Sequence, residues 1–427
     1  MNASRIELPP RKLISALRQH NLLPAIVFLP TRRRCDEAVQ DIRNDRSQPA
    51  NEQKRSKRQE LFSEFSTGHP EIAGHKQAQA IINSGVASHH AGHVPAWKLL
   101  VEKMMAAGLL DTIFATSTVA AGVDFPARTV VISNADTRGN DGWRPLSASE
   151  LQQMTGRAGR RGRDKVGFVV LVPGPFQNIR KIAELLSAKP DPLESKFRAT
   201  YTSLLNLLDA YGSLAQVREV AEKSFAFRSA TGKSTPQRQS DGLWLPFERR
   251  AKVLDKLGYI DLASEAVTAD GKWLADLRID RPLIVGEALR AGIFDGLTPP
   301  DLAALIAAIA SDPDRNYGML RMSNRLAGCI DQLEEVMQTV AEIEWKFGVA
   351  PADELNASAA TSAARWAQGI EWDELTAATR AEPGDLIRLL SRTGEALCQI
   401  AELREPDRSV ASLAAAAAAA ILRDPVR

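Results

Sequence analysis

Short apolar segments alternate with helical stretches through residues 8–190, and this alternation constrains the fold more than any other feature of the sequence. Strands that are apolar along their whole length and are separated by helices are typical of a parallel sheet buried on both faces. One of the intervening helices is the amphipathic stretch at 95–109. We therefore predict an α/β domain with a parallel sheet. The expected strands lie at 24–29, 85–92, 111–116, 128–133 and 166–172.

The pattern changes after Pro190, where helical segments replace the alternation. A polar linker is expected at 229–242. Residues 249–277 follow the order helix, strand, turn, strand, with a hairpin at 259–272, which is typical of a small winged-helix domain. From about residue 284 onward the sequence is helical and rich in alanine. The predicted domains are 1–190 (α/β), 191–283 (winged helix) and 284–427 (all-α).

Composition excludes some classes of protein. The net charge is only +2, so any nucleic-acid binding must come from local basic surface. The polar stretch 43–60 could be such a basic patch, but a charge run of this kind is more often a solvated loop or helix face, which we favour. The start has no apolar signal-peptide core, and no apolar run approaches the roughly 18 residues that a membrane span needs. Three widely spaced cysteines, Cys35, Cys329 and Cys398, fit reduced thiols, so we expect a cytoplasmic protein with no membrane partner.

Two loops carry candidate ligand contacts. The stretch "MTGRAGRRGRDKVG" (154–167) holds four arginines separated mostly by glycine and alanine. A guanidinium offers a planar fork of donors that suits phosphate oxygens. The stretch "FATSTVAAGVDFPARTVV" (114–131) places polar and glycine residues directly after a strand, where open α/β sheets position ligands. A surface loop that binds nothing is therefore the less favoured interpretation.

These two stretches, preceded by "VASHHAGHVPAWKLLVEKMMAAGLL" (86–110), resemble the second RecA-like motor domain of superfamily 2 DExH helicases in order and spacing. The branch that they resemble most is the Ski-type branch of exosome-assisting RNA helicases. The resemblance continues through the segment leading into that branch's winged helix and into its C-terminal helical domain, at 286–309 and 366–397. It covers nearly the whole chain.

The resemblance implies a role for each matching residue. Gln153, Arg157 and Arg160 match a Q-x-x-G-R-x-x-R pattern whose arginines reach the γ-phosphate of ATP and stabilise charge on the transferred group. Asp124 matches a position that contacts the ribose, and Gly122 allows close approach of the backbone. Contacts with the bound nucleic-acid strand are implied for Thr31, Arg32, His90, Gly92, Thr116 and Thr118.

Arg388 and Arg392 lie one turn apart on the same face of the helix expected at 384–403. In the family the corresponding helix lies along the channel and contacts bases, which we favour over an ordinary surface pair. Arg161 and Arg163 have no implied role.

Three histidines, His89, His90 and His93, fall within five residues, as in some metal sites. No cysteine or carboxylate lies near them in sequence, and the segment is a strand followed by a loop. We therefore predict no metal here.

Such a motor also needs a phosphate-binding loop and an acidic box for Mg²⁺ on its first motor domain. "TGKST" (231–235) supplies only the second half of the loop, because Phe227 stands where the first glycine must be. "DEAV" (36–39) opens a helix instead of ending a strand. The first motor domain is therefore expected on the missing part of a longer protein or on a separate chain, in cis or in trans, and it would hold most of ATP and Mg²⁺.

The sequence thus predicts the C-terminal part of an ATP-dependent helicase that acts on single-stranded RNA or DNA, with RNA favoured. The chain alone is expected not to hydrolyse ATP. The alternatives are a DNA-repair helicase of the same branch and a non-catalytic scaffold that binds nucleic acid.

Overall fold

The computed structural model divides the chain into two compact units, residues 1–192 and 193–427, which are described separately. The residues described are 8–43, 51–117, 119, 126–139, 142–174, 177–193, 195, 197–229, 236–318, 320–351, 354–403 and 408–427. The first boundary falls close to the predicted one. The further boundary predicted at 283/284 stays a prediction.

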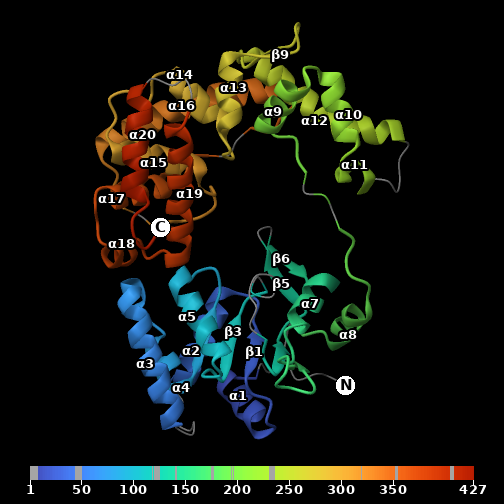
Figure 1. Cartoon of the computed structure of the whole chain (residues 1–427), viewed down its shortest axis with the longest axis vertical. Helices are drawn as coiled ribbons and strands as arrows, with labels where there is room; N and C mark the ends of the chain where they lie inside the picture. Colours follow the sequence, from blue (N-terminus) through green and yellow to red (C-terminus); the bar gives the residue numbers. More distant parts are fainter. Residues whose placement is uncertain are drawn as a thin grey trace. The chain divides into compact units, whose positions relative to one another are not determined.

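The five predicted strands are all present in the first unit and form one sheet (Figure 1). They pair in the order β2-β3-β1-β4-β7, and every neighbouring pair is parallel. Their carboxyl ends therefore share one edge of the sheet, and their amino ends share the opposite edge. The strands are β1 Ala25–Phe28, β2 Val86–His89, β3 Thr112–Ala115, β4 Thr129–Ile132 and β7 Phe168–Leu171.

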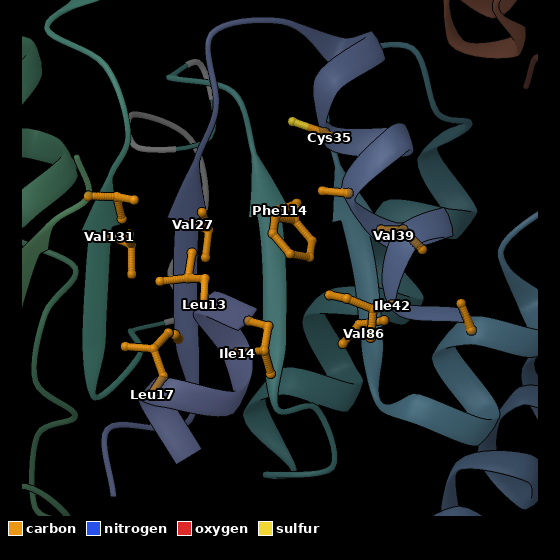
Figure 2. Close-up of a cluster of buried hydrophobic side chains, with 14 residues drawn as sticks. Leu13, Ile14, Leu17, Val27, Cys35, Val39, Ile42, Val86, Phe114 and Val131 are labelled. Atoms are coloured by element: carbon orange, nitrogen blue, oxygen red, sulfur yellow. The ribbon is translucent and has the colours of Figure 1, made fainter. Parts of the chain in front are cut away.

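Helices cover both faces of this sheet. On one face, α1 and α2 pack their apolar side chains against Val27, Phe114 and Val131 (Figure 2). Alternate residues of a strand face opposite sides, and Ile26 is only 1% exposed, so the second face is covered as well. The α/β prediction is confirmed. The helices of this unit are α1 Pro10–Gln19, α2 Arg32–Arg43, α3 Glu52–Gly68, α4 Ala78–Ser84, α5 Pro95–Ala106, α7 Ala148–Thr155 and α8 Ile179–Ser187, with a 3₁₀ turn at Pro70–Ile72.

The charged stretch 43–60 is not simply a solvated face. From Glu52 onward it belongs to α3, which Asn51 caps, and its Arg58 is only 4% exposed. The guanidinium donates to the carbonyl oxygens of Ile82 (2.7 Å), Asn83 (3.1 Å) and Leu109 (3.1 Å). Those carbonyls belong to the end of α4 and the turn after α5, so Arg58 stabilises groups that the helix ends leave without partners. The prediction of a solvated stretch is wrong at this residue.

A two-stranded hairpin, β5 Asp136–Gly139 and β6 Gly142–Pro145, separates β4 from α7. The sequence does not predict this hairpin, because neither strand has the apolar alternation of a half-buried strand. Its exposed members include Trp143, which is 59% exposed.

The second unit begins with helices and a short hairpin. The polar linker predicted at 229–242 is wrong for its last part, because α12 already begins at Pro236. The hairpin predicted at 259–272 is present only at 260–267, as two paired two-residue strands, and its last part is wrong because α13 begins at Ala269. The winged-helix assignment stays a prediction. The elements are α9 Tyr201–Tyr211, α10 Leu214–Glu222, α11 Phe225–Ser229, α12 Pro236–Lys256, β8 Ile260–Asp261, β9 Ala266–Val267 and α13 Ala269–Asp276.

The rest of the second unit is helical, as predicted. Its centre is α15, which is buried at every residue from Leu302 to Ala310 and packs against α17, α19 and α20. The helices are α14 Pro282–Arg290, α15 Pro299–Ala310, α16 Asn324–Lys346, α17 Ala357–Ala367, α18 Trp372–Thr379, α19 Pro383–Ala401 and α20 Arg408–Ile421. Across the parts of the chain that the structure describes, no helix combines the length and the apolar character needed to cross a membrane.

Gly271 provides a test of how α13 packs. A Cβ atom at this position would lie 2.0 Å from the backbone oxygen of Tyr259 and 2.7 Å from Cγ1 of Val267. Gly271→Ala should therefore lower the free energy of unfolding by about 1–3 kcal/mol, as overpacking does. Urea unfolding of the whole chain measures this change.

Gly328, in α16, is the matched control, because a Cβ atom there would meet nothing within 4 Å. Gly328→Ala should raise the free energy of unfolding by about 0.5–1 kcal/mol, the helix-propensity gain of alanine over glycine. A stabilised Gly271→Ala variant would mean that α13 is not packed on Tyr259.

Candidate functional site

Residues 156–167, here called the arginine loop, are held by their backbone against the segment that precedes β4. The Ala127 N–H donates to the Arg157 carbonyl (3.0 Å), and the Gly159 N–H donates to the Ala127 carbonyl (2.7 Å). Within the loop, a Cβ atom on Gly167 would lie 2.4 Å from the Ala158 carbonyl oxygen. Only glycine permits this crossing of two backbones. The loop therefore lies at the amino edge of β4 and β7.

Arg160 is held by a bidentate interaction with Asp164. Its Nε donates to Oδ2 (2.7 Å), its Nη2 donates to Oδ1 (3.0 Å), and its backbone N–H also donates to Oδ2 (3.0 Å). The Asp164 side chain is 2% exposed, whereas that of Arg160 is 22% exposed. Hydrogen bonding by the Arg160 guanidinium lowers the pKa of Asp164 to about 2, despite burial that opposes the shift.

The other predicted nucleotide contacts differ in their surroundings. Gln153 is exposed on α7, and Arg157 is half-buried just after that helix. A capping box formed by Ser147 and Glu150 fixes the start of α7. Arg161 and Arg163 are exposed. The predicted contacts at Gly122 and Asp124, together with Thr118, lie outside the described residues.

The residues predicted to contact the nucleic-acid strand gather at the opposite edge of the sheet. Thr31 and Arg32 follow β1, His90 and Gly92 follow β2, and Thr116 follows β3, so the parallel topology brings their loops to the carboxyl edge. Four-residue strands separate the two edges by about 13 Å. The structure thus groups these residues and keeps the arginine loop apart from them.

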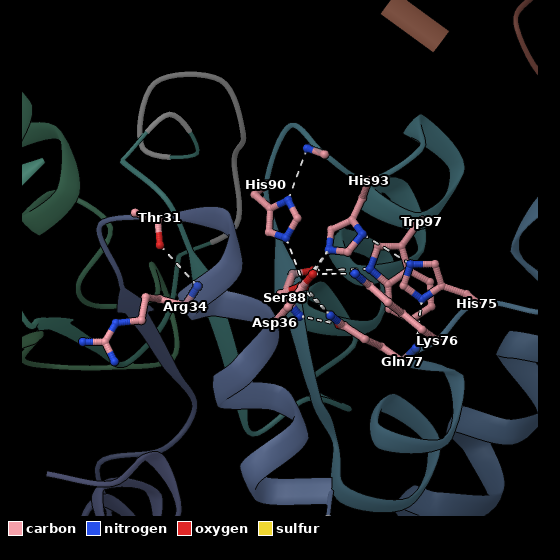
Figure 3. Close-up of polar contacts among 11 residues, drawn as sticks. Thr31, Arg34, Asp36, His75, Lys76, Gln77, Ser88, His90, His93 and Trp97 are labelled. Atoms are coloured by element: carbon pink, nitrogen blue, oxygen red, sulfur yellow. Dashed lines mark hydrogen bonds and ion pairs between the residues drawn. The ribbon is translucent and has the colours of Figure 1, made fainter. Parts of the chain in front are cut away.

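At this edge the Thr31 hydroxyl caps the start of α2. Its Oγ1 accepts a hydrogen bond from the Arg34 N–H at 3.3 Å (Figure 3). That contact satisfies one of the donors at the start of α2 that has no partner inside the helix.

A buried polar cluster lies beneath these loops, and it is called the histidine network here (Figure 3). Its centre is the carboxylate of Asp36, in the second turn of α2. Oδ1 accepts from Gln77 Nε2 (2.7 Å) and Ser88 Oγ (2.8 Å), and His90 Nε2 lies 3.1 Å away. Lys76 Nζ donates to Oδ2 at 2.5 Å. Burial by itself would raise the pKa of Asp36, but hydrogen bonds from His90 and Lys76 outweigh it and hold the pKa far below its usual range.

Backbone donors set the proton positions on the three rings. The Gln77 N–H donates to His75 Nδ1 (3.2 Å), so the proton of a neutral His75 is on Nε2, which donates to His93 Nδ1 (3.3 Å). His93 therefore carries its proton on Nε2 and donates to Ser88 Oγ (2.6 Å). By the same reasoning, the Gly92 N–H on His90 Nδ1 (3.2 Å) directs the His90 Nε2 proton to Asp36.

The rings of His75 and His93 are neutral at ordinary pH. Burial lowers the pKa of His75 to about 3, and burial likewise lowers the pKa of His93 well below its usual value. Each ring thus accepts on one nitrogen and donates from the other. His75 donates to His93, His93 donates to Ser88, and the Ser88 hydroxyl donates to Asp36.

The fold corrects one reason given against a metal. No carboxylate is near the histidines in sequence, but Asp36 joins His90 and His93 in space, with ligand atoms within 4.8 Å of one another. A metal on either Nε2 would need the proton moved to Nδ1. On His90 it would then point at the Gly92 N–H, and on His93 it would point at His75 Nε2, which carries a proton because His75 Nδ1 accepts from the Gln77 N–H. The hydrogen-bond pattern therefore favours a protonated network over a metal site.

The burial of His90 limits the contact with nucleic acid that was predicted for it. Its side chain is fully buried, at 0% exposure. The contact that the resemblance implies would have to come from the backbone of this loop.

The two candidate arginines of the second unit differ in pairing. Arg388 is exposed on α19. Arg392 forms an ion pair with Asp280, and its Nη1 lies 3.6 Å from Asp312 Oδ1. Much of the charge of Arg392 is therefore balanced within the protein.

Comparison with known proteins agrees with this picture. The model of the DSHCT (NUC185) domain family matches residues 264–427. The chain is 37% identical over 227 residues to the chloroplastic DExH-box ATP-dependent RNA helicase DExH15 of Arabidopsis thaliana, covering 49% of this chain and 19% of that protein.

Two further relatives are the probable helicase HelY of Mycobacterium tuberculosis (32% over 255 residues; 58% of this chain, 27% of HelY) and human superkiller complex protein 2 (33% over 217 residues; 50% and 17%). The aligned segment covers less than a third of the length of each of these relatives.

The chain is a homologue of the Ski-type DExH helicases. The resemblance drawn from the motifs is confirmed. The match to the DSHCT model begins at residue 264, within the β8–β9 hairpin and before the boundary predicted at 284.

The histidine network predicts a pH dependence of stability. Below about pH 6.5 the unfolded chain protonates His75 and His93, whereas the folded chain keeps them neutral, so the unfolded state binds more protons. The free energy of unfolding should therefore fall as the pH falls from about 6.5 toward 3, by up to about 1.4 kcal/mol per pH unit for each group. Urea unfolding between about pH 7.5 and about pH 4.5 measures the slope.

His75→Gln removes one titrating ring and should flatten this slope, even if stability at neutral pH is lower. The matched control is His20→Gln, because His20 is exposed at the end of α1. The explanation fails if His75→Gln keeps the slope of the unaltered protein.

Proposed function

We propose that this chain supplies the second motor lobe and the channel helices of an ATP-dependent helicase acting on single-stranded nucleic acid, with RNA favoured. The observation that carries the proposal is the clamped arginine loop, which fixes Arg157 and Arg160 within the Q-x-x-G-R-x-x-R pattern. The name of the Arabidopsis relative, an ATP-dependent RNA helicase, supports the choice of ATP and RNA.

Arg160 is suited to a phosphoryl group that is bound elsewhere. Two of the five N–H groups of its guanidinium face Asp164, and the opposite edge of the fork faces away from that carboxylate. A planar donor held in this way offers hydrogen bonds to a phosphate without first having to be ordered.

The nucleotide itself needs a first motor domain with a phosphate-binding loop, in cis or in trans. That domain holds Mg²⁺ and the β-phosphate. Asp124 contacts the ribose, with Gly122 beside it, and Gln153, Arg157 and Arg160 approach the γ-phosphate. The chain's three cysteines are free thiols, which supports work in a reducing compartment such as the cytoplasm.

Each unit contributes one contact with the nucleic-acid strand. In the first unit the contact comes from Thr31, Arg32, Thr116, Thr118 and the loop after β2, and in the second unit it comes from Arg388 on α19. Thr116 and Thr118 precede Gly122 and Asp124 by only a few residues, so the proposed contacts with nucleic acid and with the ribose come from one segment of the sequence, between β3 and β4.

The first test measures ATP turnover. The chain should hydrolyse ATP only when it is combined with its first motor domain, and then Arg160→Ala should lower kcat on the order of 10³-fold or more. The affinity for ATP should fall much less, because the guanidinium acts mainly on the transferred group. Arg160→Lys should not restore turnover, since an ammonium lacks the planar fork.

Arg163→Ala is the control, because Arg163 is an exposed arginine of the same loop that lies outside the matched pattern. An equal loss of kcat in Arg160→Ala and Arg163→Ala would mean that the loop contributes only general positive charge. Turnover by the purified chain alone would contradict the need for a first motor domain, and no turnover in the combined protein would favour a scaffold.

The second test measures strand binding by the chain alone. Arg388→Ala should weaken the binding of a labelled oligouridine and should reduce the slope of log affinity against log salt by about one. Arg392→Ala should change the affinity less, because Asp280 and Asp312 already balance its charge. Fluorescence anisotropy at several salt concentrations gives both quantities.

Arg365→Ala is the matched control, because Arg365 is an exposed arginine on α17 of the same unit. Equal effects of Arg365→Ala and Arg388→Ala would remove the case for a channel along α19. Oligothymidine of the same length, run in parallel, distinguishes a DNA helicase from an RNA helicase.

A further inference from the structure

Asp164 is a buried carboxylate that the matched helicase pattern does not use. Its side chain is 2% exposed, a costly position for a charge unless donors surround it. Three donors come from Arg160, through its backbone N–H, its Nε and its Nη2. A single carboxylate therefore fixes both the main chain and the side chain of Arg160.

The local turn explains how Asp164 reaches this position. The N–H groups of Arg163 and Asp164 both donate to the Arg160 carbonyl at 3.0 Å, and Gly162 has a φ of +74°. The chain closes one tight turn between Arg160 and Asp164. The turn thereby places the Asp164 carboxylate against Arg160, the first residue of the turn.

A second arginine connects Asp164 to the sheet. Arg128, directly before β4, places Nη1 3.4 Å from Asp164 Oδ1, and its guanidinium lies over the ring of Phe168, 5.6 Å from the centroid. The Arg128 carbonyl accepts from the Phe168 N–H (3.1 Å). Arg160 is thus joined to the sheet in two ways. One is the backbone clamp at Ala127, and the other is the pair of side-chain contacts from Arg128 to Asp164 and from Asp164 to Arg160.

We propose that Asp164 is a positioning residue that holds the Arg160 guanidinium with one edge turned toward the transferred phosphoryl group, and that Arg128 supports Asp164 in this task. The proposal rests on the proposed function. An arginine without such a partner samples many rotamers, and ordering it would add to the barrier of each turnover. The ion pair removes that cost before ATP binds.

The test is a double-mutant cycle in the protein combined with its first motor domain. Asp164→Asn keeps the size of the side chain but replaces one acceptor oxygen by an NH₂ group that faces Arg160 donors. It should lower kcat about 10- to 100-fold and leave KM for ATP within about threefold. In an Arg160→Ala background the same change should have no further effect, because Asp164 acts through Arg160.

The outcomes separate this proposal from the proposed function. An unchanged rate in Arg160→Ala overturns the role of Arg160 in hydrolysis itself. A large loss in Arg160→Ala, with an Asp164→Asn loss that is additive, leaves that role intact and overturns the positioning role, as does faster turnover in Asp164→Asn. Glu184→Gln is the control, since Glu184 is a 61% exposed acid on α8, and it should not change turnover.

A direct measurement covers the case in which Asp164→Asn fails to fold. In the chain alone, the Arg160 Nε–H group should give a slowly exchanging NMR signal, because Asp164 protects it. Arg128→Gln should speed that exchange and lower kcat less than Asp164→Asn does, again with no effect in the Arg160→Ala background. Rapid exchange of the Arg160 signal in the unaltered chain overturns the proposal.

Discussion

The close crossing of two backbone segments within the arginine loop is the constraint on which the candidate nucleotide site depends. Gly159 has a φ of +90°, and Gly167 leaves no room for a Cβ atom beside the Ala158 carbonyl. The glycines therefore serve close approach and a left-handed turn, rather than mobility. Because the two backbones lie so close, Ala127 can exchange hydrogen bonds with Arg157 and Gly159. These hydrogen bonds fix the position of the loop at its first arginine. The loop is rigid where its composition alone would suggest a flexible segment.

The opposite edge of the sheet is stabilised by different means. There the loops after β1 and β2 rest on the histidine network, in which Ser88 and His90 direct hydrogen bonds to the carboxylate of Asp36. An unpaired charge at Asp36 would be costly, and the donors that satisfy it come from two other segments, Lys76–Gln77 and Ser88–His90. The network therefore joins α2, the segment before α4 and the end of β2. Loops joined in this way keep their spacing, which the proposed contact with a nucleic-acid strand would require.

The sheet could be predicted because each strand can be recognised from its own residues. A strand that is buried on both faces is a short run of apolar residues. The family followed from three motifs in the right order. The histidine network could not be predicted, since Asp36 and His90 are 54 residues apart and nothing near either one marks the pairing. Arg58 was missed for a related reason, because its acceptors are backbone carbonyls, which leave no trace in the sequence. The β5–β6 hairpin lacks apolar alternation, so its strands resemble a loop.

Charge in this protein has to be judged by pairing rather than by count. Arg58 and Arg392 are both basic residues in stretches that resemble binding surfaces, yet one is buried on carbonyls and the other is balanced by two acids. Arg388 is one turn from Arg392 and remains exposed. Arg160 is an intermediate case, because its partner Asp164 occupies one edge of the guanidinium only. A carboxylate that is shared with Arg128 and held in a closed turn orders the arginine while the fork keeps a second face for an anion. Pairing of this kind prepares an arginine for a phosphate, whereas the pairing of Arg58 uses the side chain entirely for the fold.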